Sequence, residues 1–180
     1  MLYLIGFIAT IVGANVALAE YGIVPIGFGM SAPAGVYFAG LAFTMRDGVR
    51  ERLGLRGTAL AVLAGAALSF MLEDARTFAV ASGVAFGLSE AADAVVYEPL
   101  RQRSRMVAVI ASNTVGLTLD SVIFLWLAFG SLAFIEGQIV GKAYMTGIVV
   151  LLLLWWRFWG HVTMNNGVER GRDLLRDLVR

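Results

Sequence analysis

The 180-residue chain contains no cysteine and a single histidine. The absence of cysteine excludes disulfides, thiolate catalysis and cysteine-ligated metal sites. His161 alone cannot form a two-histidine metal motif such as HExxH, and the sequence has neither a GxSxG nucleophile elbow nor a GxxxxGK[ST] phosphate loop. We therefore expect a protein that is not an enzyme and that holds no metal and no cofactor. An ATP-driven step would need another subunit.

Charge is also scarce. Charged residues make up 15% of the chain and hydrophobic residues 59%, with a mean hydropathy of +0.79. A soluble domain is nearer half apolar and a quarter charged. The apolar residues form long blocks that do not alternate with polar ones, which favours spanning helices over barrel strands. The composition predicts an all-α integral membrane protein embedded in a lipid bilayer.

Six apolar segments are long enough to cross a membrane. They cover about Leu2–Ala19, Ser31–Met45, Thr58–Leu72, Thr77–Leu100, Met106–Phe129 and Gly137–Trp159. Residues 1–160 would thus form one six-helix transmembrane domain, and residues 161–180 an amphipathic cytoplasmic tail. The glycine-containing connection at residues 20–35 would either fold back to cap a cavity or form an ordinary turn at the interface.

Basic residues gather on alternate connections. Arginines cluster after the second span, after the fourth span and at the C-terminus. With six spans these connections share one side, and the positive-inside rule places that side and both termini in the cytoplasm. We expect a multi-pass protein of the bacterial inner membrane. Because topology already explains the arginines, we expect no binding of nucleic acid.

The fourth and fifth predicted spans carry polar residues within apolar sequence. Glu90, Asp93 and Tyr97 have the spacing i, i+3, i+7 and share one helical face. Asn113 and Asp120 share a face of the next helix. Because a carboxylate is costly in lipid, it usually faces a bundle interior or a solute pathway. These residues could simply hold helices together, or line a polar cavity that binds a small solute; the carboxylates could also couple protons.

Depth within the membrane suggests two levels. At a rise of 1.5 Å per residue, Asp93 and Asn113 lie roughly 10–12 Å from the cytoplasmic helix ends, and Asp120 about 20 Å. Lys142, in the sixth span, falls at a depth similar to that of Asp120. A buried charge is retained best when it is paired. We therefore predict an ion pair between Asp120 and Lys142.

The same stretch carries a more specific pattern. An acidic residue is followed by a basic turn, a helix containing Ser and Asn, an Asp-Ser pair and an aromatic ending. These features are Asp93, Arg101, Ser112, Asp120, Ser121, Phe124 and Ala128-Phe129. They resemble the signature of the queuosine precursor transporter family, also called the vitamin-uptake-transporter family. RDGVRERLG and the pair Lys142 and Tyr144 resemble two further stretches of that family.

The resemblance implies a six-helix carrier for a 7-deazaguanine, typically 7-cyano-7-deazaguanine (preQ0) or its aminomethyl relative. The architecture would be similar to the substrate-binding subunits of energy-coupling-factor transporters, without a dedicated ATPase. A carboxylate can accept the guanidine-like N–H edge of such a base, and its flat ring suits stacking on Phe or Tyr. The residues predicted to contact substrate or coupling ion are first Asp93 and Asp120, then Glu90, Asn113, Tyr97, Lys142, Ser121 and Phe124.

Two alternatives stay open. One is a substrate-binding subunit that relies on a shared ATPase module for a vitamin-like solute. The other is a non-transporting membrane protein, such as a pore-former or an assembly factor. Pore-formers rarely need several buried carboxylates on inward stripes, which favours transport. The sequence leaves open the oligomeric state, the coupling ion, the preferred deazaguanine and whether it feeds tRNA or DNA modification.

Overall fold

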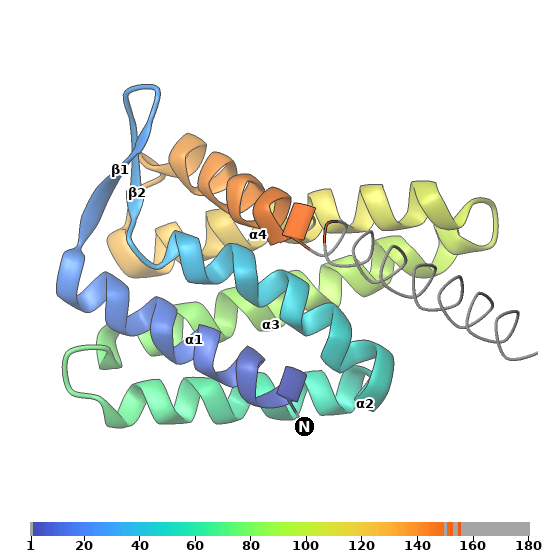
Figure 1. Cartoon of the computed structure of the whole chain (residues 1–180), viewed down its shortest axis with the longest axis horizontal. Coiled ribbons are helices and arrows are strands. Elements are labelled where there is room, and N and C mark those ends of the chain that lie inside the picture. Colours follow the sequence, from blue (N-terminus) through green and yellow to red (C-terminus); the bar gives the residue numbers. More distant parts are fainter. Residues whose placement is uncertain (1, 150, 153–154, 156–180) are drawn as a thin grey trace, which may run out of the picture. The chain divides into compact units, whose positions relative to one another are not determined.

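The computed structural model of the chain describes residues 2–149, 151–152 and 155 (Figure 1). The chain divides into two compact units, Met1–Thr146 and Gly147–Arg180, and every contact described below lies within the first. Within the described part, four helices are long and apolar enough to cross a membrane. The predicted cytoplasmic tail at residues 161–180, the end of the sixth predicted span and His161 lie outside the described residues.

The first helix, α1 (Leu2–Tyr21), matches the first predicted span and leads into a β-hairpin. Strands β1 (Ile23–Gly27) and β2 (Met30–Pro33) pair antiparallel across the connection, for which the sequence had predicted only a cap or a simple turn. The reversal at the hairpin tip uses positive φ angles at Gly27, Phe28 and Gly29. The second helix consequently begins at Val36, and its predicted start at Ser31 was wrong.

The inner side of the hairpin packs against the helices, whereas its tip does not. Ile26 and Ala32 form a small core with Val36, and Val140 packs against it. Phe28 at the tip is 88% exposed. The hairpin projects from the helices in Figure 1, as this exposure indicates.

Helix α2 (Val36–Met71) covers the second and third predicted spans and the segment between them. Only Gly54 departs from helical geometry, with φ 67° and ψ −173°, and beyond it the chain runs back in the opposite direction (Figure 1). The prediction of a basic loop from Arg46 onward was therefore wrong. Arg46 and Arg50 lie on a continuous helix, one turn apart, and not in a connection.

Helices α3 (Arg76–Arg101) and α4 (Arg105–Phe129) match the fourth and fifth predicted spans closely and pack extensively against each other. Ser104 caps the start of α4 by accepting a hydrogen bond from the Val107 amide, and Gly130 ends it in the left-handed conformation. A further helix covers residues 135–149. These helices carry the polar residues singled out above.

Small residues let this last helix approach α2 and the hairpin. A Cβ atom on Gly40 would lie 2.6 Å from Met145 Cβ and 2.9 Å from the Lys142 carbonyl oxygen. A Cβ on Gly141 would lie 2.8 Å from a methyl group of Val36, and one on Gly137 would overlap the Ser31 carbonyl. Gly137 and Gly141, four residues apart, thus let this helix pack closely, as small residues do between membrane helices.

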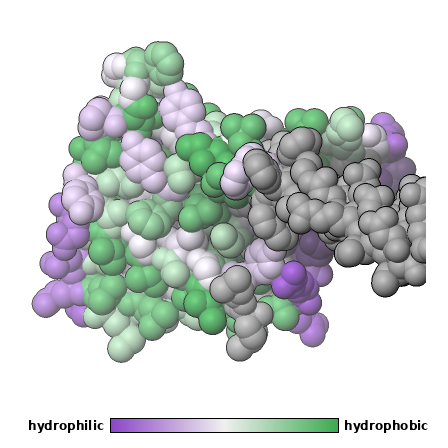
Figure 2. Space-filling model, in the orientation of Figure 1, coloured by the Kyte–Doolittle hydropathy of each residue, from purple (hydrophilic) through white to green (hydrophobic). Residues whose placement is uncertain are grey.

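The outer surface of the helices is strongly apolar. Large side chains such as Leu60, Leu63, Leu88 and Ile110 are more than half exposed. Figure 2 shows hydrophobic residues spread over most of the visible face, with hydrophilic residues gathered toward its edges. A soluble monomer rarely exposes apolar patches beyond a few hundred Å². Such a surface is suited to lipid, as expected for a multi-pass membrane protein.

Candidate functional site

The buried polar residues form two separate groups. The first is the arginine cluster, made of Arg46, Arg50, Glu90, Asp93 and Asn113. Arg46 Nη1 donates to Glu90 Oε2 at 2.9 Å, and Arg50 Nη1 donates to Glu90 Oε1 at 3.0 Å and Asp93 Oδ2 at 2.8 Å. The two arginines are four residues apart on α2 and the two carboxylates three apart on α3, so each pair shares a helical face. Two cations thus face two anions across the helix interface.

Arg46 is the hub of this cluster. It is only 3% exposed and uses all three guanidinium nitrogens. Nε and Nη2 donate to Asp47 Oδ1 at 3.0 and 2.7 Å, and Nη2 also donates to Asn113 Oδ1 at 3.2 Å. Arg46 therefore links α2, α3 and α4. Such multiple pairing is what makes a buried charge tolerable.

A cavity of about 410 Å³, the arginine cavity, opens beside this cluster. Its walls include Arg46, Arg50 and Asp93 of the cluster together with Tyr97 and Ser112. Sites for small molecules typically measure roughly 300–1,000 Å³. The arginine cavity is thus large enough for a small solute, and its lining is charged and polar.

The second group is built around Lys142. Its ammonium donates to Asp120 Oδ2 at 2.6 Å and to Ser121 Oγ at 2.8 Å, and the residue is 1% exposed. Ser121 donates its own proton to the Leu117 carbonyl, which leaves its oxygen free to accept. The predicted ion pair between Asp120 and Lys142 is confirmed.

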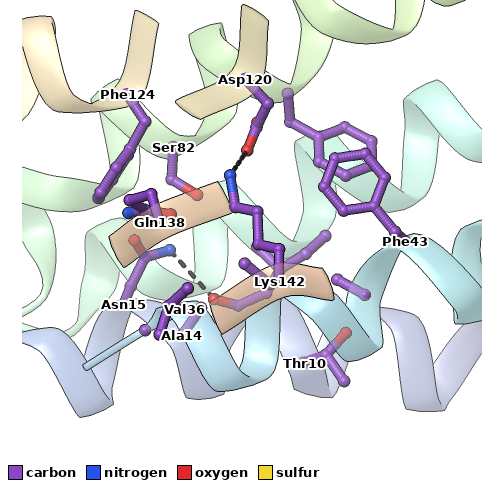
Figure 3. A pocket seen from close by; sticks show the side chains of 15 residues that line it. Thr10, Ala14, Asn15, Val36, Phe43, Ser82, Asp120, Phe124, Gln138 and Lys142 are labelled. Carbon is purple, nitrogen blue, oxygen red and sulfur yellow. Dashed lines mark hydrogen bonds and ion pairs between the residues drawn. The ribbon is translucent and has the colours of Figure 1, made fainter. Parts of the chain in front are cut away.

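A smaller cavity of about 50 Å³, the lysine cavity, adjoins this pair (Figure 3). Aromatic walls come from Phe43, Phe86 and Phe124, and polar groups come from the pair itself, Asn15 and Gln138, among others. Figure 3 shows Lys142 and Asp120 reaching toward each other from different helices beside this space. A mostly apolar and aromatic lining with a few convergent polar groups is typical of ligand pockets.

One aromatic side chain contacts both groups. The centre of the Phe43 ring lies 5.2 Å from Arg46 Cζ and 5.9 Å from Lys142 Nζ, distances suited to cation–π attraction. The ring also packs on Phe86, with 5.7 Å between ring centres. Phe43 lines the lysine cavity, and Arg46, one turn further along α2, lines the arginine cavity. Phe43 therefore contacts one cation of each charged group.

The residues predicted from the sequence divide between these two places. Glu90, Asp93 and Asn113 belong to the arginine cluster, and Tyr97 lines its cavity. Asp120, Lys142 and Ser121 form the second group, and Phe124 lines the lysine cavity. The predicted division of Asp93 with Asn113 from Asp120 with Lys142 thus corresponds to two separate groups, and the two depths stay a prediction.

Sequence reasoning missed both arginine partners. Arg46 and Arg50 were assigned to a cytoplasmic connection, because the positive-inside rule accounted for them. Their i, i+4 spacing, matched to the i, i+3 spacing of Glu90 and Asp93, was the signal that could have paired them. Gln138, one turn before Lys142, was also missed, although it is a polar residue within an apolar span.

Comparison with known families gives one match. The family described as "Putative vitamin uptake transporter" matches residues 67–160, just over half of the chain. The matched segment contains α3, α4 and the described helix after them, and with them the carboxylates of both groups. Arg46 and Phe43 lie outside it. No curated protein and no solved structure matches the chain.

Proposed function

Since the chain belongs to the vitamin uptake transporter family, we propose that it imports a queuosine precursor, 7-cyano-7-deazaguanine or a related 7-deazaguanine, across the bacterial inner membrane. The observation that carries this proposal is the pair of buried polar groups inside apolar helices, each with a cation in contact with the Phe43 ring. A solute path needs polar groups at more than one depth and a barrier between them. The two cavities and the Phe43 ring support such a path.

Six spans with both termini in the cytoplasm are the topology we propose. Reversal of α2 at Gly54 supports two spans within that helix, and the helix that covers residues 135–149 supports a last one. With α1, α3 and α4 this makes six. The arginine cavity would then face the cytoplasm, because it lies nearer the basic turn that joins α3 to α4.

The chemistry of the cavities suits a deazaguanine. Its N–H edge can donate to carboxylate oxygens such as those of Asp93 and Asp120. Its flat ring can stack on the aromatic walls of the lysine cavity. Neither cavity needs an ATP site of its own, and coupling to a gradient would act through the same carboxylates.

The proposal is tested by whether the protein restores queuosine in tRNA, which is measured directly and does not depend on cell growth. The protein is expressed in a bacterium that can neither make nor import 7-cyano-7-deazaguanine, the compound is added, and queuosine in tRNA is measured by mass spectrometry. We expect queuosine to appear with the intact protein and with Asp74→Asn, a change on the exposed turn between α2 and α3. Absence of queuosine while the protein is present in the membrane would refute the substrate.

A further inference from the structure

Gln138 carries a buried side-chain oxygen that lacks a hydrogen-bond partner in the described part of the chain. The residue is 2% exposed, and its side-chain oxygen Oε1 has no hydrogen-bond partner among the described residues. The large majority of buried side-chain polar atoms in folded proteins do have a partner. An unpaired buried amide oxygen is costly, so its position beside a cavity suits a ligand that donates a hydrogen bond to it.

The amide is placed beside the lysine cavity next to a second open acceptor. Gln138 lines that cavity and lies one helical turn before Lys142, so both side chains leave the same helical face (Figure 3). Lys142 donates a hydrogen bond to Asp120 Oδ2, whereas no described residue donates to Asp120 Oδ1. Two acceptor oxygens therefore border one space without donors of their own.

Two other polar side chains in the cavity wall, Asn15 and Thr10, donate to groups outside the pair of acceptors. The Asn15 amide nitrogen donates to the Ile11 carbonyl and to Ser69 Oγ, both at 3.1 Å. Thr10 Oγ1 donates to the Phe7 carbonyl at 2.7 Å. Neither proton is available to Gln138 or Asp120. A ligand that carries N–H donors could therefore supply the hydrogen bonds that Asn15 and Thr10 do not.

We propose that Gln138 is a specificity-determining residue of the lysine cavity, where its side-chain oxygen and Asp120 Oδ1 accept two N–H donors of a planar heterocycle stacked among the phenylalanine rings. The inference rests on the proposed function and deepens it by naming the edge of the solute that is read. At about 50 Å³ the cavity is smaller than typical small-molecule sites. A planar heterocycle would therefore need the walls of the cavity to move apart.

The test compares ligands that differ by one donor. Purified full-length protein in lipid nanodiscs is titrated with 7-cyano-7-deazaguanine and with its analogue lacking the 2-amino group, alongside guanine and hypoxanthine. We expect the wild type to prefer each member with the amino group by about tenfold or more, since a site built to bond an N–H rejects ligands that lack it. Gln138→Leu should reduce that ratio toward one, and Gln138→Glu, which keeps an acceptor, should preserve it.

Matched variants separate the possible failures. Gln102→Leu, at the exposed glutamine between α3 and α4, should leave the ratio unchanged. Gln138→Met serves as a second apolar variant if Gln138→Leu is not monodisperse. An unchanged ratio in folded Gln138→Leu or Gln138→Met overturns the inference alone. Preference for guanine without binding of any deazaguanine overturns the proposed substrate, while loss of that preference in the variants supports the role of Gln138. Binding of none of the four ligands overturns both.

Discussion

Lys142 Nζ donates to Asp120 Oδ2 at 2.6 Å, although the two residues lie 22 positions apart and on different helices. Their charges cancel at a site that almost excludes solvent. Asp120 lines the lysine cavity, and no described residue donates to its second carboxylate oxygen. The pair thus links α4 to the helix that covers residues 135–149.

Removing one member of this pair should cost more than removing both charges. We expect Lys142→Met to lower the free energy of unfolding by about 3–5 kcal/mol, because it leaves Asp120 buried and unpaired. Adding Asp120→Asn to that variant should recover part of the loss. Thermal unfolding of each purified variant in detergent, with loss of monodispersity as the readout, compares the stability of the single and the double variant. Independent and additive effects of the two changes would contradict the ion pair as a stabilising unit.

The two arginines should respond differently to lysine. Arg46 bonds three partners through three nitrogens, whereas Arg50 reaches both of its partners through Nη1 alone. A lysine ammonium can replace a single donor atom but not a planar fork. We expect Arg46→Lys to reduce uptake at least about tenfold, since several charge-assisted bonds are lost. Arg50→Lys should retain most uptake. Equal losses in an uptake assay would show that the fork geometry is unimportant.

Gly40 should be intolerant of even one methyl group. A Cβ there would crowd the Lys142 carbonyl and Met145, and push the helix that carries Lys142 away from α2. Gly87 on α3 is the matched control, because a Cβ there meets no atom within 4 Å. We expect Gly40→Ala to lower the melting temperature and Gly87→Ala to leave it equal or slightly higher, given the better helix propensity of alanine. Similar melting temperatures for both variants would contradict the close approach.

Phe43 should act as the barrier between the cavities. The chain contains no cysteine, so single cysteines can be placed at Ser82 in the lysine cavity and Glu51 in the arginine cavity without background labelling. We expect a membrane-impermeant thiol reagent on the cytoplasmic side to label Glu51→Cys but not Ser82→Cys.

Adding Phe43→Ala should then expose Ser82→Cys to the same reagent, since it removes the aromatic ring that contacts both Arg46 and Lys142. Phe43→Leu, which keeps an apolar side chain of intermediate size, should give a smaller increase. If labelling of Ser82→Cys is unaffected by either change, the ring does not separate the two cavities.

The polar pattern of α3 and α4 was predictable because lipid makes charge placement informative. Acidic residues cannot be scattered in apolar helices without partners, so spacing and depth alone gave the Asp120 and Lys142 pair. The glycines within α3 and α4 do not interrupt the helix, and Pro99 lies in the last turn of α3. Their boundaries consequently followed from hydropathy.

The first half of the chain was harder because two local features override hydropathy. The charged residues from Arg46 onward are typical of a loop. The helix nevertheless continues, because Arg46 pairs with Glu90 and Arg50 with Asp93 across the helix interface. The hairpin has no strict alternation of polar and apolar residues. Its positive φ angles at Gly27 and Gly29 show why those glycines are there, but only once the backbone is known.

Uptake by purified protein in liposomes tests the central claim most directly. Labelled 7-cyano-7-deazaguanine is added outside the vesicles, and the amount inside is followed over time against protein-free vesicles and vesicles with Asp120→Asn. The account predicts saturable accumulation with the wild-type protein, which Asp120→Asn abolishes and Asp74→Asn preserves. Accumulation equal to that of protein-free vesicles, with wild-type protein folded and inserted, would contradict it.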